Sequence, residues 1–194
     1  MKFIHIADVH LGIEPDAGSS FSEKRPREIW DSFKNIIEIC EKEQADLLLI
    51  AGDLFNRQPL MRELKEVDYL FASLSHTKVV LVAGNHDYIK NNSYYKTFQW
   101  SDNVRMILNP ELSVVEFPEL DTAVYGLSYY KKEIEEFLYD VIPKETKCTN
   151  KILLGHGGDE KHIPFHKEQL LANGYDYVAL GHIHKPQEIV PGRI

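Results

Sequence analysis

The feature that most constrains the fold is the alternation of short apolar runs with longer amphipathic segments in the first half of the chain. Runs rich in Val, Ile and Leu occupy residues 3–7, 46–51 and 78–83. Between them, residues 23–44 and 60–74 carry apolar side chains at the spacing of one helix face. Strands that alternate with helices pair in parallel and are buried on both faces. The first half of the chain therefore predicts a βαβαβ unit.

The second half of the chain predicts a second sheet or an antiparallel extension of the first. Its strand-like runs span 104–108, 112–117, 122–130, 151–156 and 177–184. Residues 131–139 favour a short helix that stops before Pro143, and a helix at 165–172 is expected to be closed by Gly174 as its C-terminal cap. We expect an α/β fold of two packed mixed β-sheets flanked by helices.

The composition fits one compact domain. The chain has 194 residues, 43% of them hydrophobic, which is enough for a sizeable core. No apolar run approaches the roughly 20 residues that span a bilayer, so we expect no membrane segment. The N-terminal residues lack the pattern of a secretory signal. Only two cysteines occur, Cys40 and Cys148, so a disulfide framework is not expected and the expected location is cytoplasmic.

The net charge limits how the chain could bind a polyanion. The formal net charge is −8, whereas proteins that bind nucleic acid mainly by neutralising its backbone usually carry a basic excess. If the chain acts on a polyanion, the attraction must be local. Bound metal ions or a positively charged partner could provide it.

Five of the apolar runs end in the same way, with a small residue followed by a carboxylate, an amide or an imidazole. These end residues are Asp8 and His10; Asp53; Asn85, His86 and Asp87; His156; and His182 and His184. In α/β sheets, sites form at the carboxyl ends of the strands, where the loops converge. We therefore expect these side chains to meet in space.

The residue types indicate a metal site. Asp, Asn and His offer oxygen and nitrogen donors, which suit Mn²⁺, Fe²⁺ or Zn²⁺ rather than a structural zinc cluster. Because alternate residues of a strand point to one face, Asp8 and His10 can both point inward, and so can His182 and His184. Seven candidate ligands exceed the needs of one ion, whereas two ions roughly 3.5–4 Å apart that share a carboxylate would use them all. Each motif alone is common, and Asn-His-Asp alone could form an Asx-type turn.

The ordered set of motifs resembles a known family. Asp-x-His, Gly-Asp, Gly-Asn-His-Asp, Gly-His and Gly-His-x-His, in this order, are the signature of the calcineurin-like metallophosphoesterases. Four segments resemble one branch of the family, the SbcD-type DNA repair exonucleases, which are the nuclease partners of the SbcC ATPase. These segments are "HIADVHLG", "LLLIAGDLF", "VAGNHD" and "DYVALGHIHKPQ". The resemblance runs from Met1 to about Gln187. It implies the four-layer metallophosphoesterase fold, two divalent ions with Mn²⁺ the first choice, DNA as substrate, an SbcC-like ATPase partner and a homodimer.

The resemblance also implies a role for each end residue. The metal ligands would be Asp8, His10 and His184 for the first ion, Asn85, His156 and His182 for the second, and Asp53 as the bridge. His86 would donate a proton to the leaving oxygen, and Asp87 would orient His86. Two bound ions lower the pKa of water from about 15.7 toward neutrality, which provides the hydroxide that attacks phosphorus.

The chain departs from the branch at one position, and several nearby residues have two readings. Asn56 stands where some nucleases of the branch carry histidine; it can hydrogen-bond a phosphate but cannot donate a proton from a cation. Arg57, Lys161 and Lys185 could contact a DNA backbone or be ordinary surface charge. A group of aromatic residues could stack on bases, form a subunit contact or pack in the core. This group comprises Tyr94, Tyr95, Phe98 and Trp100.

The remaining histidines are interpreted mainly as structural or surface residues. We expect His5 to be packed or paired on the first strand. His76 ends a helix, where a cationic ring suits the dipole. His162 and His166 could touch substrate, although a solvated surface is the simpler expectation.

Three functions stay open from the sequence. The first is a Mn²⁺-dependent DNA exonuclease or endonuclease in DNA repair, with residues 1–194 as a single catalytic domain truncated before the family's capping and ATPase-binding segments. The second is a phosphoesterase for small or cyclic nucleotides or a phosphoprotein. The third is a scaffold without activity, against which the complete set of ligand types and His86 both weigh.

Overall fold

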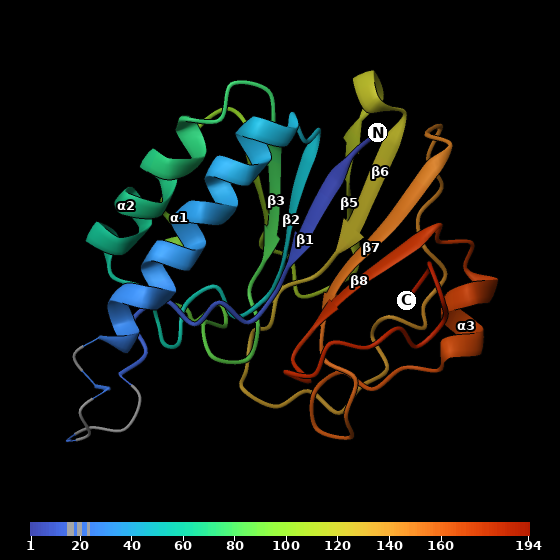
Figure 1. The fold of residues 1–194 in the computed structure, drawn as a ribbon. Coiled ribbons are helices and arrows are strands. Elements are labelled where there is room, and N and C mark those ends of the chain that lie inside the picture. Colours follow the sequence, from blue (N-terminus) through green and yellow to red (C-terminus); the bar gives the residue numbers. More distant parts are fainter. Residues whose placement is uncertain (15–17, 19–20, 23) are drawn as a thin grey trace.

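The chain folds into two four-stranded sheets that pack face to face, with helices on their outer sides (Figure 1). This computed structural model describes residues 1–14, 18, 21–22 and 24–194. The expected fold class, two packed sheets flanked by helices, is confirmed. In the described part of the chain, no helix has the length and hydropathy that crossing a membrane requires.

The first sheet is parallel throughout and has the strand order of the sequence. Its strands are β1 (Phe3–Ile6), β2 (Leu47–Ala51), β3 (Lys78–Val82) and β4 (Val104–Ile107). Helices α1 (Arg25–Glu43) and α2 (Met61–Ala72) cover its outer face (Figure 1). Both helices lie within the expected segments, although Glu23, where we expected the first to begin, lies outside the described residues. The predicted βαβαβ unit is therefore confirmed.

The second sheet is mixed. Its strands are β5 (Ser113–Phe117), β6 (Thr122–Gly126), β7 (Asn150–His156) and β8 (Tyr177–Gly181), in that order. The edge strand β5 pairs antiparallel with β6, and the other pairs are parallel. Helix α3 (Lys167–Ala172) lies on the outer side, and short 3₁₀ helices occur at Tyr94–Lys96 and Pro118–Leu120. Mixed pairing thus holds for this sheet only.

The alternation of side chains along the strands creates three apolar layers. In β2, Leu47 and Leu49 face the second sheet, whereas Leu48 and Ile50 face the helices. Successive side chains of a strand point to opposite faces, so a strand buried on both sides must be apolar at every position. All five residues of β2 are buried, which explains its uninterrupted apolar run.

The helix expected at residues 131–139 is wrong. The structure has bends and turns there, and the backbone hydrogen bonds of Ile134 run to a distant segment: its N–H donates to Lys161 and its carbonyl accepts from Ile163. The Tyr139 hydroxyl is buried and donates to the carbonyl of His156 at 3.1 Å. Tertiary pairing along the outer face of the second sheet therefore outweighs the local helical pattern.

Candidate metal centre

The first group of expected ligands meets where the loops after β1 and β8 come together. The ring nitrogens Nε2 of His10 and His184 lie 3.2 Å apart. Asp8 Oδ1 lies 3.4 Å from His184 Nε2, and the N–H of His182 donates to Asp8 Oδ2 at 2.8 Å. Residues that are more than 170 positions apart in sequence thus offer their donor atoms to one point.

A second group of expected ligands lies beside the first and is more deeply buried. His156 Nε2 is 2.9 Å from Asn85 Oδ1 and 3.4 Å from Asp53 Oδ2. All three residues are buried. On the far side of the imidazole, His156 Nδ1 donates to the Ala51 carbonyl at 2.9 Å. That hydrogen bond leaves the lone pair of the neutral ring on Nε2, toward Asn85 and Asp53.

Asp53 links the two groups. Its Oδ2 lies 3.8 Å from His10 Nε2 and 3.4 Å from His156 Nε2. Its Oδ1 accepts a hydrogen bond from the His86 N–H at 2.9 Å, which fixes the carboxylate. One oxygen of Asp53 therefore faces both groups, as a bridging carboxylate must.

The backbone geometry at these positions differs from what we expected. We predicted that Asp8 and His10 point inward as alternate residues of a strand, but β1 ends at Ile6 and β8 ends at Gly181. Five candidate ligands instead follow their strands with φ in the left-handed region: Asp8 (53°), His10 (53°), Asp53 (48°), His182 (101°) and His184 (51°). Such conformations cost on the order of 1–3 kcal/mol per residue, and they cluster at functional sites.

Two glycines allow the groups to approach. A Cβ on Gly84 would lie 2.2 Å from Asp53 Oδ1, and a Cβ on Gly52, whose φ is +80°, would lie 2.4 Å from His156 Nδ1. No side chain fits at either distance. Both motifs thus need glycine for steric reasons, and the Gly-Asp motif also needs it for the positive φ of Gly52.

The charges of the buried groups influence one another. Burial alone would raise the pKa of Asp53, but His156 and the His86 amide lower it below its usual value. Burial alone would lower the pKa of His156, but Asp53 and Asp8 raise it. Asp8 Oδ1 is a buried atom with no hydrogen-bond partner among the described residues. An unpaired carboxylate oxygen beside the imidazole nitrogens of the site and the carboxylate of Asp53 fits a pair of divalent cations.

His86 and Asp87 are arranged differently from the expectation. We predicted that Asp87 orients His86. Instead, His86 Nδ1 donates to the Asn56 carbonyl at 3.1 Å, so a backbone oxygen orients the ring. The Asp87 carboxylate is fully buried and accepts hydrogen bonds from the Gly84 and Phe55 amides and from the Tyr95 hydroxyl. Burial, followed by the charge of Asp53, raises the pKa of Asp87 to about 6.

His182 has a neighbour that the sequence did not reveal. Its Nε2 lies 2.8 Å from Asp159 Oδ2, and its ring lies 5.1 Å from the ring of His156, between centroids. Asp159 also accepts from His162 Nδ1 at 2.8 Å. Burial alone would raise the pKa of Asp159, but hydrogen bonds from His182, the Lys161 amide and His162 hold it well below its usual value. Asp159 stands three residues after His156 in a polar loop, which gave no periodic signal.

Several residues that had more than one interpretation from the sequence form contacts within the protein. Arg57 forms a two-pronged ion pair with Glu63, with N–O distances of 2.7 and 3.0 Å. Tyr95 is buried, and Phe98 and Trp100 pack against the core that covers the first sheet, so core packing is confirmed for these three, whereas Tyr94 is exposed. Three histidines are paired: His5 with Tyr177, His76 with Asp46, and His166 with Asp140.

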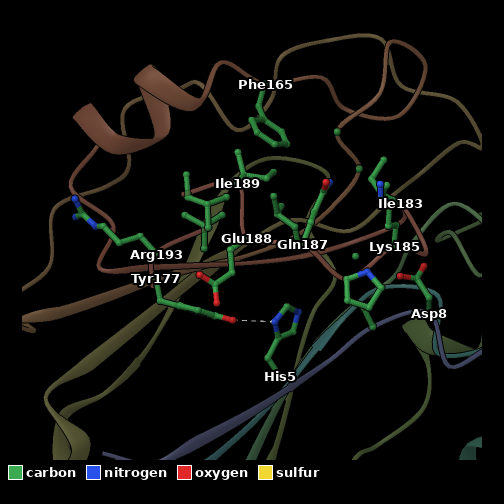
Figure 2. A pocket seen from close by; sticks show the side chains of 18 of the residues that line it. His5, Asp8, Phe165, Tyr177, Ile183, Lys185, Gln187, Glu188, Ile189 and Arg193 are labelled. Carbon is green, nitrogen blue, oxygen red and sulfur yellow. Dashed lines mark hydrogen bonds between the residues drawn. The ribbon is translucent and has the colours of Figure 1, made fainter. Parts of the chain in front are cut away.

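A cavity of about 950 Å³ adjoins the first ligand group on the side of β8. Asp8 and His184 form part of its wall. Figure 2 shows apolar side chains, among them Phe165 and Ile189, together with Lys185 and Gln187. A cavity of this size holds a drug-sized or nucleotide-sized molecule.

Comparison with known proteins identifies the family. A family model described as "Calcineurin-like phosphoesterase" matches residues 1–186. The chain is 31% identical over 194 residues to "DNA double-strand break repair protein Mre11" of Methanocaldococcus jannaschii, covering 95% of this chain and 52% of that protein. It is 29% identical to "Uncharacterized metallophosphoesterase YhaO" of Bacillus subtilis, covering 96% and 49%. It is 30% identical to a protein of Staphylococcus epidermidis named as part of the nuclease SbcCD, covering 97% and 58%. The chain spans about half the length of these curated relatives.

Proposed function

The chain belongs to the calcineurin-like phosphoesterase family of metal-dependent hydrolases, and on that basis we propose that it is a two-metal phosphodiesterase that cleaves DNA. The observation that carries the proposal is the position of Asp53 Oδ2, within 4 Å of both His10 Nε2 and His156 Nε2. The proposed ligands are Asp8, His10 and His184 for one ion and Asn85, His156 and His182 for the other, with Asp53 between them; the ring of His182 lies beside that of His156. Mn²⁺ is the proposed metal.

The metal pair supplies one part of the chemistry and the chain supplies the rest. When bound, two divalent ions activate a water molecule near neutral pH and offset the negative charge of the phosphate. The chain's net charge of −8 would repel DNA without such local positive charge. The left-handed backbone after β1, β2 and β8 holds the donor groups in place before substrate arrives.

His86 is the proposed general acid. Its Nδ1 donates to the Asn56 carbonyl, so Nε2 is the nitrogen available to give a proton to the departing sugar oxygen. Its ring is exposed and lies 4.8 Å from the ring of His10, between centroids, so it stands at the open side of the ligand group. Asp87 acts at a distance from the ring: it fixes the Gly84 and Phe55 amides, and through them the loops that carry His86 and Asn56.

DNA as the substrate rests on the relatives. Two of them bear names that describe DNA break repair or a nuclease, and the similarity to each covers at least 95% of this chain. In this proposal residues 1–194 form one catalytic domain, and an SbcC-like ATPase and a second copy of the chain are its partners. Asn56 and Lys185 are the proposed phosphate contacts, and Arg57 would have to leave Glu63 to join them.

A second candidate is hydrolysis of a small or cyclic nucleotide. The cavity beside Asp8 and His184 has the volume for one nucleotide, and the acidic net charge does not favour a long polyanion. Both candidates use the same metal ligands and the same acid. They differ only in the molecule that carries the phosphate: DNA in the first candidate, a small or cyclic nucleotide in the second.

The test compares His86→Ala with His76→Ala, a surface control whose ring pairs with Asp46 away from the site. With Mn²⁺ and linear DNA, we expect wild type and the control to cleave, and His86→Ala to lose roughly 10²–10⁴-fold in rate. The loss should be smaller on bis-p-nitrophenyl phosphate, because its leaving group needs less protonation. Equal rates for His86→Ala and wild type on DNA would contradict the acid role. Cleavage of cyclic nucleotides without cleavage of DNA would establish the second candidate.

A further inference from the structure

Asp159 lies outside the motifs that define the family signature in this sequence, yet it contacts one of the proposed metal ligands. We propose that Asp159 is a positioning residue that fixes the ring orientation and the tautomer of His182, so that His182 offers Nδ1 to the metal. The inference rests on the two-metal site proposed above and adds a residue to it. No contact between Asp159 and substrate is required.

The loop after β7 holds Asp159 in a defined place. Asp159 Oδ1 accepts from the Lys161 N–H at 2.9 Å and from His162 Nδ1 at 2.8 Å. The N–H of His162 donates to the Asp159 carbonyl, and the Gly158 N–H donates to the His162 carbonyl. The Gly157 N–H donates to Gly181, the residue before His182, and this ties the loop to the end of β8.

The carboxylate of Asp159 accepts hydrogen bonds from two imidazoles. His162 Nδ1 lies 2.8 Å from Oδ1 and 3.0 Å from Oδ2, and His182 Nε2 lies 2.8 Å from Oδ2. The side chains of His162 and His182 are only 17% and 14% exposed, whereas that of Asp159 is 45% exposed, so the two rings are enclosed by the protein while the carboxylate also faces solvent. The rings of His162 and His182 lie 4.2 Å apart between centroids, which further restricts rotation of His182.

The chemistry of the acceptor determines the tautomer. An ionised carboxylate can only accept, so His182 Nε2 must carry the hydrogen and the lone pair of the neutral ring is on Nδ1. His156 shows the opposite arrangement, because its Nδ1 donates to the Ala51 carbonyl and its lone pair is on Nε2. Metal-binding histidines usually donate their second N–H to a carboxylate or a carbonyl, which fixes the tautomer and increases the basicity of the ligand. The two imidazoles proposed for one ion would thus bind it through different nitrogens.

The same three residues could instead hold an ion of their own, because Asp159, His162 and His182 offer donor atoms within 4.8 Å of one another. The hydrogen bonds argue against this use. Each oxygen of Asp159 already accepts from an imidazole nitrogen, so an ion there would have to displace both hydrogens. A count of bound ions separates the two readings.

The main test is Mn²⁺ titration of the purified chain by calorimetry. We expect wild type to bind two ions, and Asp159→Ala to bind one of them about 10–100-fold more weakly. Asp159→Asn should lose less, because its amide oxygen can still accept from His182. Asp140→Asn is the matched control, since Asp140 also accepts from a histidine, His166 Nδ1, at 2.6 Å. It should bind both ions as wild type does.

A second measurement does not depend on any variant or on bound metal. Nitrogen NMR of the metal-free wild type at a pH where the ring is neutral should show His182 protonated at Nε2. Protonation at Nδ1 would overturn the inference, and so would wild-type affinity for both ions in Asp159→Ala. A third bound ion that disappears in His162→Ala would also overturn it. If wild type binds no Mn²⁺, the proposed function fails instead, so the two failures can be told apart.

Discussion

Removing the hydroxyl of Tyr95 tests how the buried carboxylate beneath the site is stabilised. Tyr95 Oη donates to Asp87 Oδ2 at 2.8 Å, and both residues are buried. Among the described residues, the remaining donors to Asp87 are two backbone amides, from Gly84 and Phe55. Tyr95→Phe therefore takes one of three donors from a carboxylate that water cannot reach.

The expected cost follows from the charge of the acceptor. A hydrogen bond to a charged group contributes about 1.5–3 kcal/mol, more than a neutral pair does. At roughly 2–4 °C per kcal/mol for a domain of this size, Tyr95→Phe should lower Tm by about 3–12 °C. Tyr175→Phe is the matched control, because Tyr175 is equally buried but its hydroxyl has no hydrogen-bond partner among the described residues. That control should be neutral or slightly stabilising.

The loss of unfolding free energy caused by Tyr95→Phe should also depend on pH, and the pKa of Asp87 determines the direction of this dependence. Burial raises the pKa of Asp87 to about 6, and the Tyr95 hydroxyl opposes that rise, so Tyr95→Phe raises the pKa further. The difference in unfolding free energy between wild type and Tyr95→Phe should be largest above the pKa of Asp87 in the variant and should shrink as pH falls through that pKa and then through 6, below which the carboxyl is protonated in both proteins. Urea unfolding with chelator present measures it. Equal stabilities for Tyr95→Phe and Tyr175→Phe at pH 8 would refute the reasoning.

Three further outcomes are expected. Gly84→Ala should lower the unfolding free energy by about 1–3 kcal/mol and weaken Mn²⁺ binding, because the new Cβ would lie 2.2 Å from Asp53 Oδ1. An unchanged Mn²⁺ affinity in calorimetry would contradict this. Hydrogen bonds from the Lys2 N–H and His76 lower the pKa of Asp46. Wild type should therefore be more stable than Asp46→Asn at pH 7, and this advantage should be lost as pH falls through the folded-state pKa of Asp46. A difference in urea unfolding that stays constant down to pH 3 would contradict this. Burial raises the pKa of Cys40 to about 11, so a thiol reagent should modify it only after unfolding, and fast reaction of the native thiol would contradict its burial.

The convergence of the site could be predicted from the sequence because it follows from strand direction. Parallel strands place their carboxyl ends at one edge of a sheet, and polar residues such as Asp53 and Asn85 follow the strands directly. The structure brings these groups together as expected. What the sequence did not predict is the backbone: the inward direction of Asp8 and His10 comes from left-handed φ values, which a strand pattern does not contain.

The contacts that the sequence missed depend on groups without a sequence signal. The partner of His86 is the carbonyl of Asn56, and every residue has a carbonyl. Asp159 lies in a loop whose sequence has no helix or strand periodicity. The backbone hydrogen bond between this loop and the end of β8 brings Asp159 to His182. Residues 131–139 carried a helical pattern, but the segment gains more by pairing with residues 161–163 than by bonding within itself.

The most direct test of the central claim is an anomalous difference map of a crystal of this chain soaked in Mn²⁺. The account predicts two peaks about 3.5–4 Å apart, one beside Asp8, His10 and His184, the other beside Asn85, His156 and His182, with a carboxylate oxygen of Asp53 touching both. A single peak, or two peaks that Asp53 does not join, would contradict it.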